Sequence, residues 1–200
     1  MELIILAGMP ATGKSTVARA LSGAFGFPVI EKDEIKEVLF DTIGFENYPQ
    51  KRRLDIAASA TLLQVLESML KAGTSVIAVN NFDEKETQQV CSLIERYQPN
   101  CVTVFLNGAP EVLYQRYVQR DKLHLRHLGH VLQERYPPRE GDCLDYTMTP
   151  EEFDRKFFQR GIISLSEAIR GADTFTVPSS PTLRYMFFIR FLVTSILILP

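Results

Sequence analysis

The sequence contains no tryptophan and only three cysteines among its 200 residues. The cysteines are odd in number, lie far apart and form no C-x-x-C pair; they are Cys91, Cys101 and Cys143. This pattern excludes the disulfide framework of a small secreted domain and offers no zinc ligand set, so we expect a reducing compartment. Because Glu2 stands where a signal peptide would be basic, the sequence predicts a cytoplasmic protein.

Neither sign of charge dominates the chain, whose formal net charge is -2 and whose isoelectric point is about 6.0. No global basic field therefore draws the protein to nucleic acid, although a local basic groove is compatible with this composition. Hydrophobic residues make up 46% of the chain, which is enough for one domain with a substantial core. The sequence has no internal repeat and no low-complexity linker.

The most informative stretch is residues 8–16, which have the G-x-x-x-x-G-K-S spacing of a phosphate-binding loop. An apolar run at residues 3–7 precedes it, as expected of a buried strand, and a helical apolar pattern follows until Gly26. Backbone N–H groups of such a loop and of the helix N-terminus bind phosphate oxygens. Lys14 is expected to contact the β- and γ-phosphates of ATP, and Ser15 to ligate Mg²⁺. The residues expected to hold the nucleotide are Gly8, Met9, Pro10, Ala11, Thr12, Gly13, Lys14, Ser15 and Thr16.

Apolar runs and helical patterns alternate along the rest of the chain. Further strands are expected near residues 27–30, 74–79, 101–106 and 174–177. Helices are expected from about residue 31, over 54–69, over 84–97, from Pro110 and from Pro150, and residues 41–50 are expected to be looser. Asp83 with Glu86 and Thr149 with Glu152 have the spacing of helix-capping boxes. This alternation with short connections predicts an α/β protein with parallel strands and right-handed crossovers.

Three charged side chains outside the loop are candidates for the site. Asp33 follows the second expected strand, and functional groups of open parallel sheets lie at the carboxyl ends of strands. Its alternative role is a favourable negative charge in the first turn of a helix. Arg116 and Arg120 lie four residues apart on one helix and so share a face, although solvated surface arginines would show the same spacing.

All three histidines fall within seven residues, as His124, His127 and His130. A metal site there is disfavoured, because no cysteine or carboxylate ligand joins them and Gly129 weakens a helix at this point. A mobile basic segment is the preferred interpretation.

With these parts in place, residues 2–180 resemble the P-loop small kinases of the polynucleotide-kinase and zeta-toxin-like group, to which chloramphenicol phosphotransferase is similar. The resemblance rests on residues 8–16, on Lys32-Asp33-Glu34-Ile35-Lys36 and on the arginine pair. It implies a three-layer P-loop kinase fold with a mostly parallel, five-stranded sheet, helices on both faces and a helical lid at about residues 112–135. In this group the aspartate after the second strand deprotonates the acceptor hydroxyl, and a basic residue three positions later contacts the acceptor. These roles carry over onto Asp33 and Lys36, although arginine is more usual at the second position, and Arg116 and Arg120 resemble the catalytic arginines of the lid.

One departure concerns the third strand, which in these families usually ends in an acidic residue. Here Val79 stands at that position, followed by Asn80 and Asn81. An asparagine carries no charge to Mg²⁺, but the amide of Asn81 could hold a metal-bound water or the acceptor.

The leading hypothesis is an ATP-dependent kinase that transfers the γ-phosphoryl group to a hydroxyl of a small molecule or nucleotide. The change at Val79 keeps a second hypothesis open, a nucleotide-binding protein or degenerate kinase without phosphotransfer. A nucleic-acid 5′-hydroxyl kinase is the third, since one 5′ end needs only a small basic groove. The identity of the acceptor is not encoded in any motif.

The last segment of the chain, residues 181–200, is set apart from the domain at 1–180 by its composition. Residues 185–200 are nearly all apolar, with Arg190 among them. As a helix they would reach about 24 Å, short of the roughly 30 Å hydrocarbon core, so a membrane span is disfavoured. We expect this segment to pack on the domain or at a contact between two copies of the chain.

Overall fold

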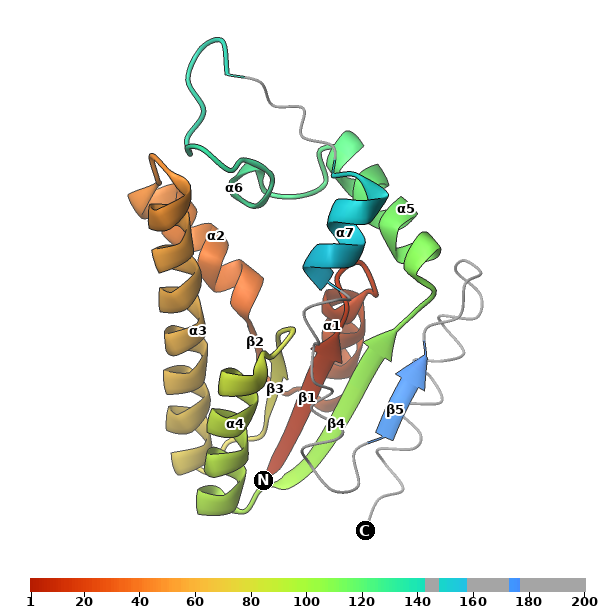
Figure 1. The fold of residues 1–200 in the computed structure, drawn as a ribbon. Helices are drawn as coiled ribbons and strands as arrows, with labels where there is room; N and C mark the ends of the chain where they lie inside the picture. The colour runs from red at the N-terminus through yellow and green to blue at the C-terminus, as the bar shows by residue number, and fades with distance from the viewer. Residues whose placement is uncertain (143–147, 158–172, 177–200) are drawn as a thin grey trace.

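A computed structural model describes residues 1–142, 148–157 and 173–176. Five parallel strands form one sheet in the order β2-β3-β1-β4-β5 (Figure 1). The strands are β1 (Glu2–Gly8), β2 (Val29–Glu31), β3 (Val76–Val79), β4 (Asn100–Asn107) and β5 (Asp173–Thr176). The expected five-stranded parallel α/β sheet is therefore confirmed.

The helices alternate with the strands, as the sequence predicts. They are α1 (Lys14–Phe25), α2 (Lys32–Ile43), α3 (Tyr48–Lys71), α4 (Glu84–Tyr97), α5 (Pro110–Lys122), α6 (Leu128–Val131) and α7 (Pro150–Phe157). The prediction of a looser stretch at residues 41–50 is wrong at both ends, because only residues 44–47 separate α2 from α3. Pro49 misleads the sequence interpretation, because proline is well tolerated in the first turn of a helix. The side chain of Asn47 caps this helix by accepting a hydrogen bond of 3.0 Å from the N–H of Gln50.

Helices cover both faces of the sheet (Figure 1). The alternation along β1 explains why, because successive side chains of a strand point to opposite faces. Leu3 and Ile5 pack in a cluster with residues of α3 and α4, whereas Ile4 and Leu6 pack with residues of α1. Two buried clusters thus hold β1, and with it the loop that follows, in the middle layer of a three-layer structure.

Both predicted capping boxes are present. Asp83 accepts from the N–H of Glu86 at 2.8 Å while the Glu86 carboxylate accepts from the N–H of Asp83 at 2.9 Å. Thr149 and Glu152 make the same reciprocal pair at the start of α7. Among the described helices, none is long and apolar enough to cross a membrane. Cys143, the domain boundary expected at residue 180 and the apolar segment 181–200 all lie outside the described residues.

Candidate active site

The loop between β1 and α1 has the backbone shape of a phosphate cradle. Gly8 has φ +127°, and a Cβ atom there would lie 1.9 Å from the carbonyl oxygen of Leu106, so the position admits only glycine. The N–H of Met9 donates to the same carbonyl of β4 at 3.1 Å. Gly13, with φ 90°, then opens α1, whose first N–H groups face the loop. The predicted strand–loop–helix setting is confirmed.

Lys14 lies back against the loop. Its Nζ donates to the carbonyl oxygens of Gly8 and Met9, at 3.0 Å each. Burial lowers the pKa of Lys14 to about 8, an effect that the nearby charges of Asp33 and Glu31 partly offset. A bound phosphate would supply the negative charge that this desolvated ammonium lacks.

Beside the loop lies a cavity of about 780 Å³. It is lined by residues of the loop, by the start of α2, by one face of α5 and by α6. The sequence-predicted residues that line it are Pro10, Ala11, Gly13, Lys14, Ser15, Thr16, Asp33, Asn81, Arg116 and Arg120. Gly8, Met9 and Thr12 shape the loop without lining the cavity, and the hydroxyl of Thr12 donates to the Met9 carbonyl at 2.7 Å. Segments far apart in the sequence thus meet at one site.

Asp33 lies in the first turn of α2, exposed to the cavity. Burial acts to raise the pKa of its carboxyl, but the positive charges of His130, Lys36, Lys14 and Lys32 outweigh it, so the pKa is lowered. The carboxylate is therefore ionised at neutral pH and can accept a hydrogen bond from a hydroxyl group.

Arg116 and Arg120 both face the cavity from α5, as their spacing predicts. Within the described part of the chain, neither guanidinium group makes a hydrogen bond or an ion pair. Burial, together with the charge of Arg126, lowers the pKa of Arg120. Two guanidinium groups that line one cavity with a phosphate loop are suited to binding phosphoryl oxygens.

Glu31 is a site residue that the sequence interpretation missed. The hydroxyl of Ser15 donates to Oε1 of Glu31 at 2.6 Å, and burial foremost raises the pKa of this carboxyl. Glu31 is the last residue of β2, and its register partner is Val79, the last residue of β3. The acid expected at the end of β3 therefore stands on the neighbouring strand. An acidic residue directly after the apolar pair Val29 and Ile30 is the signal that could have found it.

The hydroxyl of Ser15 and the carboxylate of Glu31 fit a Mg²⁺ site, because this ion prefers oxygen ligands and binds through one or two carboxylates beside substrate phosphates. Asn80 does not take part, since its side chain is buried and donates to Oε2 of Glu86 at 3.0 Å. Asn81 lines the cavity, and its contact with the acceptor or with a metal-bound water stays a prediction.

Lys36 does not line the cavity, contrary to the expectation that it contacts the acceptor. Its Nζ lies 2.9 Å from Oδ1 of Asp55 on α3. The preferred interpretation of the histidine segment also changes, because the structure ties it to α2. His127 contacts Asp41 at 3.0 Å and His130 contacts Glu37 at 3.0 Å.

A parallel sheet with a phosphate-binding loop between its central strand and the following helix is the architecture of one class of proteins, those that bind nucleotides through a P-loop. The comparison with known families agrees with this class: the chain belongs to the AAA domain family, which matches residues 3–137.

Three individual proteins share between 17% and 29% sequence identity with this chain. The chain is 29% identical over 152 residues to a shikimate kinase of Rhodopseudomonas palustris, a match that covers 70% of each chain. A solved putative kinase from Chloroflexus aurantiacus has a TM-score of 0.74 at 24% identity, covering 98% of this chain and 96% of that one. A gluconokinase from Sinorhizobium meliloti has a TM-score of 0.54 at 17% identity, covering 98% and 93%. These structural likenesses show the fold.

Proposed function

We propose that this protein is an ATP-dependent kinase that transfers the γ-phosphoryl group to a hydroxyl group of a small molecule. The observation that carries the proposal is that Asp33, Lys14, residues of the loop, Arg116 and Arg120 line one cavity. The charges of Lys14 and Asp33, and those of Asp33 and Arg120, act on each other, which supports a shared site. The shikimate kinase relative supports a hydroxyl acceptor.

The loop amides and Lys14 would hold the phosphates of ATP in line with the acceptor. Asp33 would accept a hydrogen bond from the acceptor hydroxyl, whose oxygen forms a bond to the γ-phosphorus as the bond to the β–γ bridging oxygen breaks. The hydroxyl proton passes to Asp33 and ADP leaves. Arg116 and Arg120 would stabilise the charge on the transferred group, and Mg²⁺ held by Ser15 and Glu31 would neutralise charge on the β- and γ-phosphates.

The alternative of a degenerate kinase depends on the missing acid at Val79. Glu31 weakens that alternative, because its carboxylate lies 2.6 Å from the Ser15 hydroxyl and supplies an acidic group at the same corner of the site. A 5′-hydroxyl kinase for nucleic acid would need a basic wall beside Asp33, whereas Glu34 and Glu37 occupy that wall.

The test combines an acceptor screen with the Asp33→Asn variant. Wild-type protein should transfer labelled phosphate from γ-labelled ATP to a hydroxyl compound. Asp33→Asn should bind ATP normally in calorimetric titration and lose transfer by ~10²–10⁴-fold, as is typical of a lost general base. Near wild-type transfer with a lowered melting temperature would instead assign Asp33 to stabilising the start of α2.

A further inference from the structure

Helix α2 carries its charged side chains in two stripes with opposite surroundings. Asp33, Glu34 and Glu37 line the cavity. Lys32 and Lys36, four residues apart, face α3 instead. Nζ of Lys36 lies 2.9 Å from Oδ1 of Asp55, and Nζ of Lys32 lies 3.4 Å from the same atom. The two lysines of this helix are therefore paired with Asp55 away from the cavity, whereas Asp33, Glu34 and Glu37 face it.

The acidic stripe is held in place by α6. The imidazole of His130 is only 8% exposed, and its Nε2 lies 3.0 Å from Oε1 of Glu37. Gly129 brings the two helices close, since a Cβ atom there would lie 2.2 Å from Cδ2 of Phe40 on α2.

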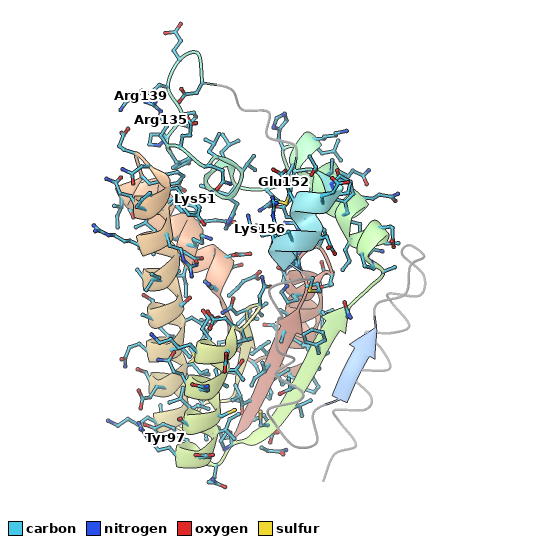
Figure 2. The ribbon with its side chains drawn as sticks, viewed as in Figure 1. Lys51, Tyr97, Arg135, Arg139, Glu152 and Lys156 are labelled. Carbon is cyan, nitrogen blue, oxygen red and sulfur yellow. The ribbon has the colours of Figure 1, made fainter. Side chains whose placement is uncertain are left out.

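The side chain of Lys51, a residue of α3, reaches α6 (Figure 2). Its ammonium donates to the carbonyl oxygens of His130, at 3.1 Å, and of Leu132. Lys51 thus binds the backbone of α6 and stabilises the side of the cavity that α2 and α6 build, the acceptor wall.

The other cations that line the cavity, Lys14, Arg19, Arg116, Arg120 and Arg126, lie outside the wall built by α2 and α6. Lys14 is part of the phosphate loop, and Arg116 and Arg120 face it from α5. Arg126 makes two contacts with the carboxylate of Asp121, at 2.8 and 3.0 Å, and its guanidinium group lies 4.4 Å from the ring centre of Tyr117. On the wall built by α2 and α6, the described residues offer an acceptor only one cationic side chain, His130, and its Nε2 is taken by Glu37.

The chemistry of this wall selects an acceptor. Ionised carboxylates only accept hydrogen bonds, so they bind hydroxyl or ammonium groups and repel acids. Proteins that recognise a carboxylate usually present an arginine to it, and this wall presents none among its described residues. Asp33 and Glu37 are one helical turn apart on one face of α2, so two donors on one small molecule can reach both.

We propose that the acceptor is a polyhydroxylated compound without an acidic group, bound with one hydroxyl at Asp33 and a second hydrogen-bond donor at Glu37. This inference rests on the proposed kinase function and names its substrate class. It separates this chain from its shikimate kinase relative, which is named for an acid.

The first experiment offers the full-length protein three pools of acceptors with Mg²⁺ and γ-labelled ATP. One pool holds neutral polyols and sugars including glucitol, one holds amino analogues including glucamine, and one holds hydroxy acids including gluconate and shikimate. We expect labelled product from the neutral or amino pool at a rate at least tenfold above the acid pool. Equal or faster labelling of the acid pool would overturn the inference and leave the kinase function standing. No labelled product in any pool, with ATP binding intact, would overturn the kinase function itself.

The second experiment tests Glu37 through its isosteric variant, Glu37→Gln. Loss of a charged hydrogen-bond partner should raise the KM of the labelled acceptor about ten- to a hundredfold and leave the KM of ATP unchanged. The double variant Glu34→Gln/Glu37→Gln should also raise labelling of the acid pool relative to the neutral pool. Glu95→Gln, the same change at an exposed position on α4, should match wild type. An unchanged acceptor KM in Glu37→Gln, with the melting temperature preserved, would remove Glu37 from the acceptor site.

Discussion

Glu31 shows how much one side chain contributes to the nucleotide end of the site. Its carboxylate accepts a hydrogen bond from the hydroxyl of Ser15, which is the Mg²⁺ ligand expected from the loop. Burial raises the pKa of Glu31 when no cation is bound. A divalent cation beside it would favour the ionised form, so Mg²⁺ binding and ionisation of Glu31 should be coupled.

We expect Glu31→Gln to raise the Mg²⁺ concentration needed for half-maximal turnover by roughly ten- to a hundredfold, a range typical of groups that support a metal site. The amide keeps the size of the side chain and its contact with Ser15 but removes the negative charge. A Mg²⁺ titration of the steady-state rate at saturating ATP measures the effect, with Glu95→Gln as the control. Unchanged Mg²⁺ dependence would restrict Glu31 to orienting the Ser15 hydroxyl.

At the scale of single elements, α5 brings two guanidinium groups to the cavity at once. Groups that stabilise charge on the transferred phosphoryl act mostly in the transition state. Arg116→Ala and Arg120→Ala should therefore lower kcat more than they raise the KM of ATP, and lysine at either position should restore only part of the rate. Steady-state kinetics test this, with Gln115→Ala, an exposed position on the same helix, as the control.

Hydrogen exchange distinguishes a lid from a static surface. Exchange across residues 112–135 should slow when a non-hydrolysable ATP analogue binds, because Arg116 and Arg120 would then contact its phosphates. Unchanged exchange, together with full activity of both alanine variants, would show that α5 is not part of the catalytic machinery.

Lys51 links α3 to α6 and so positions the acceptor wall without touching the phosphate loop. Lys51→Met removes the donor to the carbonyl oxygens of His130 and Leu132. We expect the KM of the acceptor to rise about fivefold or more, as for the loss of one hydrogen bond, while the KM of ATP stays unchanged. Lys71→Met, an exposed change on the same helix, is the matched control. A parallel rise of both KM values would mean that Lys51 supports the whole domain and not the wall.

Elements with local signals could be predicted from the sequence, and elements fixed by distant contacts could not. The loop spacing and the capping boxes at Asp83 and Thr149 depend on residues within one or two turns, and the structure contains all of them. The pairing of Lys36 with Asp55 and of His130 with Glu37 joins separate helices. Helical periodicity places these residues on faces but does not say which helix lies opposite. The sequence therefore predicts residues next to a local motif, such as Lys14 and Asp33, and misses Glu31 and Glu37, whose roles depend on contacts with other elements.

At the scale of the whole molecule, two lysines with lowered pKa values make stability depend on pH. Burial lowers the pKa of Lys14 to about 8 and that of Lys51 to about 7, from 10.5 in the unfolded chain. Above pH 7 the unfolded state therefore binds more protons than the folded state, so the free energy of unfolding should rise with pH. Each lysine contributes at most about 1.4 kcal/mol per pH unit.

Urea denaturation between pH 7 and 8.5, at fixed ionic strength, measures this slope. Tyr136, whose pKa is raised from 10.0 to about 12, is protonated in both states over that range and does not affect the slope. Cys101, whose pKa is raised from 9.0 to about 11, stays protonated in the folded state while the unfolded thiol begins to ionise, so it opposes the rise at the upper end of the range. Lys51→Met should flatten the rise from pH 7, and Lys14→Met the part near pH 8. A wild-type free energy that is constant or falls with pH would contradict the assignment of both lysines as destabilising cations.

The register between Glu31 and Val79 also bears on how such sites change over evolutionary time. The two positions are neighbours across parallel strands, so their side chains emerge from the same face of the sheet beside each other. An acid can therefore move from one strand to the next by two substitutions, through an intermediate that carries either two acids or none, while the backbone stays in place. A carboxylate can thus occupy the same place at the ends of these strands from either of two positions in the sequence.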